Sequence, residues 1–277
     1  MAGRSWAFTR GLDHAAASWP GTRHLAFLDA RQQRVLAHCR AFSYVHLLGN
    51  YEDFILVHVE SMAADADRRL AEGLGRFGEE ERKHEHLFRR AETTLEASCG
   101  HAFERYFDAE RSRVTALTDA ILGYPSLPRF LILLALEWGT QQHFVESVRE
   151  RSDPLYADVL RAHWVEEAQH TKWDTLAVAR LAADADVEEL TAAFDDVLAI
   201  GALVDATFAG QAEAEVRTLE RITGRALSES EAIALRDALH RSLAASIAGL
   251  ALTHPASAKV ALELTPRGAA KLGISAG

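Results

Sequence analysis

Two stretches decide the fold: Phe77-Gly78-Glu79-Glu80-Glu81-Arg82-Lys83-His84 and His163-Trp164-Val165-Glu166-Glu167-Ala168-Gln169-His170. Each contains the pattern Glu-x-x-His, as Glu81 with His84 and as Glu167 with His170. Residues three apart share a face of an α-helix, so each pair would present a carboxylate and an imidazole together. In a chain with this composition about one such pair is expected by chance, so the pattern is informative only through its surroundings.

Both pairs lie within apolar stripes. Apolar residues recur every three or four positions around them, which predicts helices whose core-facing side carries each pair. The stripes are Leu70, Leu74, Phe77, Glu81, His84, Phe88, Ala91 and Leu95, and Tyr156, Leu160, His163, Glu167, His170, Asp174, Val178 and Leu181. An unpaired buried carboxylate is strongly unfavourable or takes up a proton. Something must therefore compensate these charges, and two divalent cations would do so.

Two more glutamates, Glu52 and Glu137, each stand alone in an apolar stripe of a further predicted helix. Their stripe neighbours are Val45, Leu48, Ile55 and Val59 for Glu52, and Phe130, Leu133, Phe144 and Val148 for Glu137. Glu60 is the alternative to Glu52, but its face carries other polar residues and is expected to meet solvent. The separations from Glu52 to Glu81 and from Glu137 to Glu167 are nearly equal, which places the carboxylates of each antiparallel helix pair at similar depth.

The rest of the sequence also predicts helices, because strand-like alternation and hairpin dipeptides are rare. The expected helices span about 22 to the mid-60s, 70–97, 102–122, 128–150, 152–183, 186–222 and 228–254, with short helical pieces over 255–277. We expect an all-α protein in which residues 1–277 form a single domain. Its metal-binding bundle would cover about 22–183, and accessory helices about 186–277.

The composition disfavours several classes of partner and indicates the cellular compartment. The net charge of −10 disfavours nucleic acid and anionic membranes as partners. Cys39 and Cys99 form no CxxC motif, which disfavours a disulfide framework and a thiolate zinc site. The first twenty residues lack the apolar core of a signal peptide, and the most apolar run, Phe130 to Leu136, is too short to cross a bilayer. We expect a cytoplasmic protein.

A glutamate from each of two helices and Glu-x-x-His from two others resembles the ferritin-like diiron carboxylate superfamily. His163, one turn before Glu167, extends the second motif to His-x3-Glu-x2-His. This resembles the p-aminobenzoate N-oxygenase family of diiron oxygenases, in which the extra histidine is a third imidazole on one iron. The two stretches also look similar to motifs of a family of predicted metal-dependent hydrolases. The ligand spacing resembles aldehyde-deformylating oxygenases, which lack the extra histidine. The resemblance covers about residues 45–180.

The resemblance implies a ferritin-like four-helix bundle with additional helices, holding two iron ions, with manganese as the alternative metal. The metal-binding and catalytic residues would be Glu52, Glu81, His84, Glu137, His163, Glu167 and His170. One ion would take Glu52, Glu81 and His84, and the other Glu137, His163, Glu167 and His170, with Glu81 and Glu167 as bridges. Ligating histidines usually donate their second N–H to a carboxylate. The expected partners are Glu80, Glu166 and Asp174.

The implied activity is that of a diiron oxygenase. It would use O2 and an external electron donor to N-oxygenate or hydroxylate a small organic substrate. No further cofactor is expected, because the G-x-G-x-x-G run at 73–78 follows no strand. The alternatives are a ferroxidase or iron store, a protein like the predicted metal-dependent hydrolases, and a metal-free interaction module with buried Glu–His salt bridges. The oligomeric state is open, with a homodimer as one option.

Overall fold

The protein is helical throughout the part of the chain that the structure describes. The computed structural model describes residues 25–64, 66–149 and 153–275, and no strand occurs within these ranges. The helices are α1 (Ala30–Ala64), α2 (Arg68–Cys99), α3 (Glu104–Leu122), α4 (Ser126–His143), α5 (Pro154–Ala182), α6 (Val187–Thr223), α7 (Glu229–Ala244), α8 (Leu250–Thr253), α9 (Pro255–Leu264) and α10 (Pro266–Lys271). The predicted all-α class is confirmed. None of these helices is both long and apolar enough to cross a membrane.

Capping residues set two helix starts within two residues of the predicted positions. Asp153 accepts hydrogen bonds from the first free N–H groups of α5, whose first residue is Pro154. Ser228 and Glu231 form a reciprocal capping box at the start of α7. Both starts are therefore confirmed.

The predicted start of the first helix near Thr22 is not matched by the described residues, where α1 begins at Ala30. Residues 22–24 themselves lie outside the described part. The Asp29 carboxylate accepts the Gln32 backbone N–H at 2.8 Å, and the Gln32 side chain accepts the Asp29 N–H at 2.9 Å. This reciprocal cap satisfies two N–H groups that a helix end leaves free, and so favours a start at this point.

Two of the predicted helices contain π-helical turns. Phe144–Val148 form one after α4, and Ala245–Gly249 form another between α7 and α8. The turn at Ala245–Gly249 brings the backbone of Ile247 close to Gly139 of α4. A glycine is needed there because no side chain fits between the two segments.

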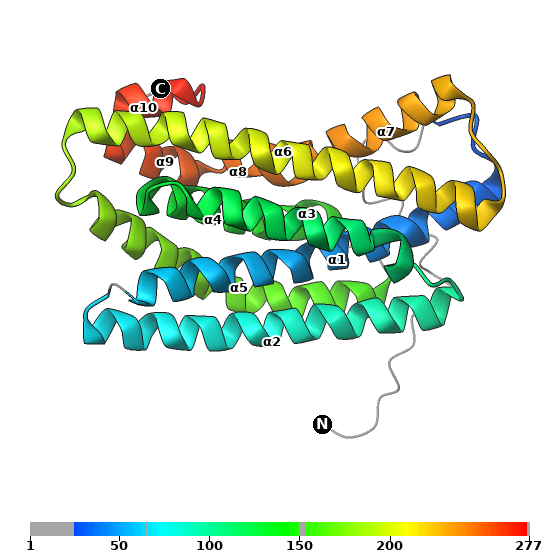
Figure 1. The fold of residues 1–277 in the computed structure, drawn as a ribbon, viewed down its shortest axis with the longest axis horizontal. Helices are drawn as coiled ribbons and strands as arrows, with labels where there is room; N and C mark the ends of the chain where they lie inside the picture. The colour runs from blue at the N-terminus through cyan, green and yellow to red at the C-terminus, as the bar shows by residue number, and fades with distance from the viewer. Residues whose placement is uncertain (1–24, 65, 150–152, 276–277) are drawn as a thin grey trace.

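The helices pack in sequential pairs, with α6 along one side. α1 packs along α2, and α4 along α5, while α2 also contacts α5 and α1 contacts α4. In Figure 1, α2 and α6 lie on opposite sides of the view with α1, α3, α4 and α5 between them. α6 contacts α1, α3 and α4, and the chain after it returns along α6 and α4. The interior between α1, α2, α4 and α5 is thereby closed off on the α6 side.

A buried polar cluster fastens α6 to α1. The Arg40 guanidinium lies 3.4 Å from the Glu215 carboxylate, and both side chains are almost fully buried. Ser43 donates to Glu215 at 2.6 Å and accepts from Gln211 at 2.7 Å. Because every bond joins α1 to α6, this cluster fixes the position of α6 over the helices that carry the site.

Gly139 and Gly75 give a matched pair of substitutions for testing this packing. Gly139→Ala would push a Cβ into the Ile247 carbonyl oxygen, whereas a Cβ at Gly75 would meet nothing within 4 Å. We expect Gly139→Ala to lower the free energy of unfolding by about 1–3 kcal/mol. Gly75→Ala should raise it by about 0.5–1 kcal/mol, because alanine loses less backbone entropy in a helix.

The measurement is urea unfolding of the metal-free protein followed by circular dichroism. A neutral or stabilising Gly139→Ala would contradict the close approach of α4 and the segment after α7.

Candidate metal centre

Four helices bring the seven predicted ligand residues into the interior. Glu52 comes from α1, Glu81 and His84 from α2, Glu137 from α4, and the remaining three from α5. Every one of the seven residues exposes 6% of its surface or less. Six of them form two overlapping groups whose potential ligand atoms lie within 4.8 Å of one another: Glu52, His84, His163 and Glu167; and Glu81, His84, Glu167 and His170. These buried groups can hold metal ions.

Glu81 and Glu167 each span two histidines. The Nδ1 atom of His84 lies 3.1 Å from Oε2 of Glu81 and 3.1 Å from Oε1 of Glu167. The Nδ1 atom of His170 lies 2.9 Å from the other Glu81 oxygen and 3.2 Å from the other Glu167 oxygen. A cation at either imidazole nitrogen would therefore find one oxygen from each carboxylate. Two cations could share the same two carboxylates.

His163 lies on the His84 side of this pair. Its Nε2 atom is 3.0 Å from Oε1 of Glu52 and 2.7 Å from Oε1 of Glu167. The sequence-based assignment placed His163 with Glu137 and His170, and the structure instead groups it with Glu52 and His84. The reason is helical rise: seven residues separate His163 from His170 by roughly 10 Å along α5, so they reach opposite ends of the Glu167 carboxylate.

Glu137 and Asp174 are buried carboxylates that belong to neither group. No N–H or hydroxyl group of the described residues donates a hydrogen bond to any of their four carboxylate oxygens. Burial raises the pKa of Glu137 well above its usual range, and the neighbouring charge of Glu167 raises it further. Burial and then Glu81 raise the pKa of Asp174 in the same way. Such unpartnered oxygens are costly in an apolar interior unless a proton or a cation meets them.

Glu80 and Glu166 support the two motif histidines in a crossed arrangement. The Nε2 atom of His84 lies 3.1 Å from Glu166, which is on the other helix, and that of His170 lies 3.1 Å from Glu80. Each contact is suited to an Nε2–H donor and a carboxylate acceptor, which leaves the Nδ1 lone pair facing the cluster. This is how hydrogen bonds orient histidines that bind metals. Asp174, the third expected support, makes no such contact with His170.

Electrostatics show how the metal-free site balances its charge. Burial lowers the pKa of His170, but the carboxylates of Glu167 and Glu81 outweigh this and raise it to about 11. The same two carboxylates raise the pKa of His84 to about 9 against the effect of burial. Burial, then Glu81 and Glu167, raise the pKa of Glu52 well above its usual range. Protons therefore occupy the metal-free cluster at neutral pH, and a metal must displace them.

The donor set is one that can hold divalent metal ions. It consists of carboxylate oxygens and imidazole nitrogens, and neither cysteine belongs to it. Cys39 is buried beside the Glu215 carbonyl instead, with 3.9 Å between Sγ and the oxygen. The unpartnered oxygens of Glu137 and Glu52 are further donors available to a cation.

Several other polar residues have a definite place. Glu60 is exposed and pairs with Arg82 at 2.6 Å, so its face meets solvent as predicted. His143 is buried and lies 2.8 Å from the Tyr44 hydroxyl. Burial lowers its pKa to about 3, which keeps this imidazole neutral. Sequence reasoning missed Tyr44, because only the packing of α1 against α4 brings it to His143.

No family model, curated protein or solved structure matches the chain. The interpretation of the site therefore depends on the geometry described above.

Glu52 and Glu60 provide a matched test of the site on α1. We expect Glu52→Ala to lower the metal bound per chain, because it removes a buried carboxylate that contacts His163. Glu60→Ala should leave metal binding unchanged, because Glu60 lies at the surface. The measurement is the metal content of desalted protein after anaerobic loading with iron(II).

Unfolding of both metal-free variants serves as the control for misfolding. Glu52 carries an unpartnered buried oxygen, so its removal should not destabilise the metal-free fold strongly. Equal metal content in two folded variants would overturn the assignment of Glu52.

Proposed function

We propose that the protein is a ferritin-like four-helix bundle of α1, α2, α4 and α5 that holds two iron ions and acts as a diiron oxygenase. One observation carries the proposal: Glu81 and Glu167 each direct one oxygen toward His84 and the other toward His170. This is the arrangement that two carboxylates need in order to bridge two cations. A Glu from each of two helices with Glu-x-x-His from two others is the ligand pattern of such bundles.

In this proposal, Glu81 and Glu167 would be ligands of both ions. Glu52, His84 and His163 would complete one site, and Glu137 and His170 the other. The distribution follows the distances from His163 to Glu52 and Glu167. It leaves the two ions with different numbers of imidazoles. Manganese is the alternative metal for the same donors.

A bound diiron centre would supply the electrons that activate dioxygen, while the protein provides orientation, electrostatics and a dry site. Glu80 and Glu166 hold the imidazoles of His170 and His84 in place from outside the cluster. Phe77 packs on His170, with ring centres 4.5 Å apart, and Phe88 packs on His163 at 4.9 Å. These aromatic side chains exclude water from the ligands.

The resemblance through His163 favours N-oxygenation or hydroxylation among the possible reactions. Both would need a small organic substrate, dioxygen and an external electron donor, which are the partners we propose. A cytoplasmic location and a homodimer are part of the same hypothesis.

The fate of added iron separates an oxygenase from an iron-handling protein without knowledge of the substrate. Protein reduced and loaded with two equivalents of iron(II) should consume oxygen once and keep both ions. Further iron(II) should not be oxidised at a faster rate than in buffer. The measurements are oxygen uptake and iron content after repeated iron(II) additions.

Glu137→Ala should lose a bound iron and the rapid oxygen uptake, because Glu137 is a buried donor on α4. Glu146→Ala is the matched control, since Glu146 lies exposed beyond the same helix. Continued oxidation of added iron(II) with accumulation of a ferric core, in a large multi-subunit cage, would contradict the oxygenase and favour a ferroxidase or store.

A further inference from the structure

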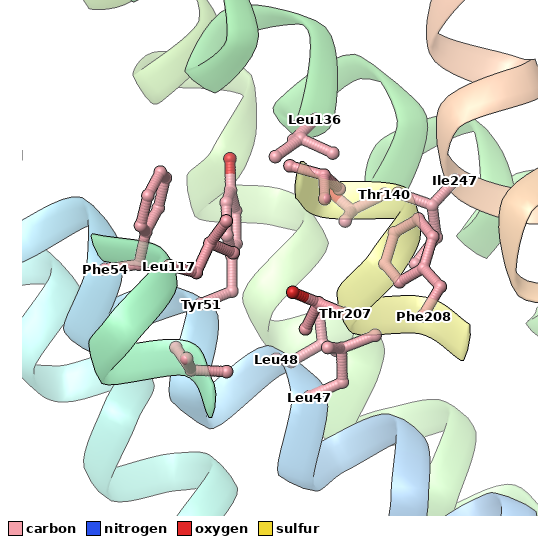
Figure 2. Close-up of a pocket in the computed structure, with 12 residues that line it drawn as sticks. Leu47, Leu48, Tyr51, Phe54, Leu117, Leu136, Thr140, Thr207, Phe208 and Ile247 are labelled. Carbon is pink, nitrogen blue, oxygen red and sulfur yellow. The ribbon is translucent and has the colours of Figure 1, made fainter. Parts of the chain in front are cut away.

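An apolar pocket lies beside the candidate metal centre on the α6 side. Figure 2 shows side chains of α1, α3, α4 and α6, and the segment after α7, converging on it. The space between the lining atoms is about 550 Å³, including the open solvent at its mouth. Its lining residues are Leu47, Leu48, Tyr51, Phe54, Val114, Leu117, Leu136, Thr140, Val204, Thr207, Phe208 and Ile247.

This pocket adjoins the ligands through two shared residues. Leu48 and Thr140 also line a smaller pocket, whose wall includes His163 and Glu167. Leu48 lies one turn before Glu52 on α1, and Thr140 one turn after Glu137 on α4. Leu48 and Thr140 therefore separate the two spaces at the level of the metal-binding carboxylates.

The apolar pocket offers nothing that would stabilise a charged ligand. Among the described residues, no charged side chain lines it. Its three hydroxyl groups already donate to backbone carbonyls: Tyr51 to Leu133 at 3.2 Å, Thr140 to Glu137 at 2.9 Å, and Thr207 to Leu203 at 3.2 Å. A carboxylate placed here would lose its hydration and receive no hydrogen bond in return, which is strongly unfavourable.

We propose that the apolar pocket binds the organic substrate, and that this substrate is an uncharged, mainly apolar molecule, such as an alkyl-substituted aromatic amine. The proposal rests on the oxygenase function proposed above and specifies its substrate class. It departs from p-aminobenzoate, the substrate in the name of the resembled family, because that molecule carries a carboxylate. The reacting group would enter past Leu48 and Thr140, while the apolar part stays among the side chains of α3 and α6.

The test compares two ligands that share an aniline ring, 4-ethylaniline and 4-aminobenzoate, by isothermal titration calorimetry at pH 7. The full-length protein is used without metal, so binding is measured apart from activity. We expect saturable binding of 4-ethylaniline, and binding of 4-aminobenzoate weaker by roughly tenfold or more. Absence of 4-ethylaniline binding, or equal or tighter binding of 4-aminobenzoate, would overturn the proposal.

Arginine variants at Leu117 and Leu198 test whether 4-ethylaniline binds in the apolar pocket. Leu117 lines the pocket and is half-buried, so an arginine there can extend toward solvent. We expect Leu117→Arg to weaken 4-ethylaniline binding and strengthen 4-aminobenzoate binding, since it adds a positive charge at the mouth. Leu198→Arg makes the same change on a leucine that is 47% exposed and lines no part of the pocket, and should alter neither affinity.

Leu117→Phe covers the case in which an arginine at this position prevents folding. Phenylalanine should fill part of the pocket and weaken 4-ethylaniline binding severalfold. Unchanged 4-ethylaniline binding in a folded Leu117→Phe would show that the ligand does not bind in this pocket.

The iron content of the same variants should equal that of the unmodified protein. Ligand binding without iron binding would refute the oxygenase but retain the pocket as an apolar site, whereas iron binding without ligand binding would refute the pocket alone.

Discussion

The structure depends on how it compensates five carboxylates buried in one place. Glu52, Glu81, Glu137, Glu167 and Asp174 are each almost fully removed from solvent. Mutual repulsion in a medium of low polarity makes such a group unstable with every member ionised. His84 and His170 offset part of the charge, because their pKa values are raised, yet several carboxylate oxygens have no partner among the described residues. Two divalent cations would satisfy the remaining oxygens and release the protons that otherwise occupy the cluster.

The surroundings of the candidate metal centre differ between its two sides. α6 is fastened to α1 by the buried Arg40–Glu215 pair, and it forms one wall of the apolar pocket. On the opposite side, Glu80 and Glu166 stand at the edge of the cluster and direct the histidines inward. The buried carboxylates thus have an apolar pocket on the α6 side and the polar side chains of Glu80 and Glu166 on the other side. In the proposed oxygenase, this asymmetry would suit an apolar substrate that approaches from the α6 side.

The approximate positions of the helices, and the faces that they bury, could be predicted from the sequence. A helical period determines which side chains share a face, so Glu81 with His84, and Glu167 with His170, could be placed on core-facing stripes without a structure. The capping box at Ser228 could be recognised for the same reason, because it is local. The chain also carried a signal for the start of α1, in the spacing of Asp29 and Gln32, which sequence reasoning did not use.

Contacts between helices could not be predicted in the same way. Which carboxylate His163 meets depends on the axial offset between α1 and α5 and on side-chain rotamers, neither of which the spacing determines. The contact of His143 with Tyr44 could not be predicted because Tyr44 lies on a different helix. The apolar pocket requires α3 and α6 to pack over α1 and α4, so residues such as Leu117 and Thr207 had no recognisable role in the sequence.

The most direct test of the central claim is a calorimetric titration of the metal-free protein with iron(II) under anaerobic conditions, repeated in buffers of different ionisation enthalpy. If cations replace protons among the buried carboxylates and imidazoles, binding saturates at two ions per chain and releases protons into the buffer. Saturation below one ion per chain, or binding without proton release, would contradict the account. The cluster would then be a network of buried Glu–His salt bridges.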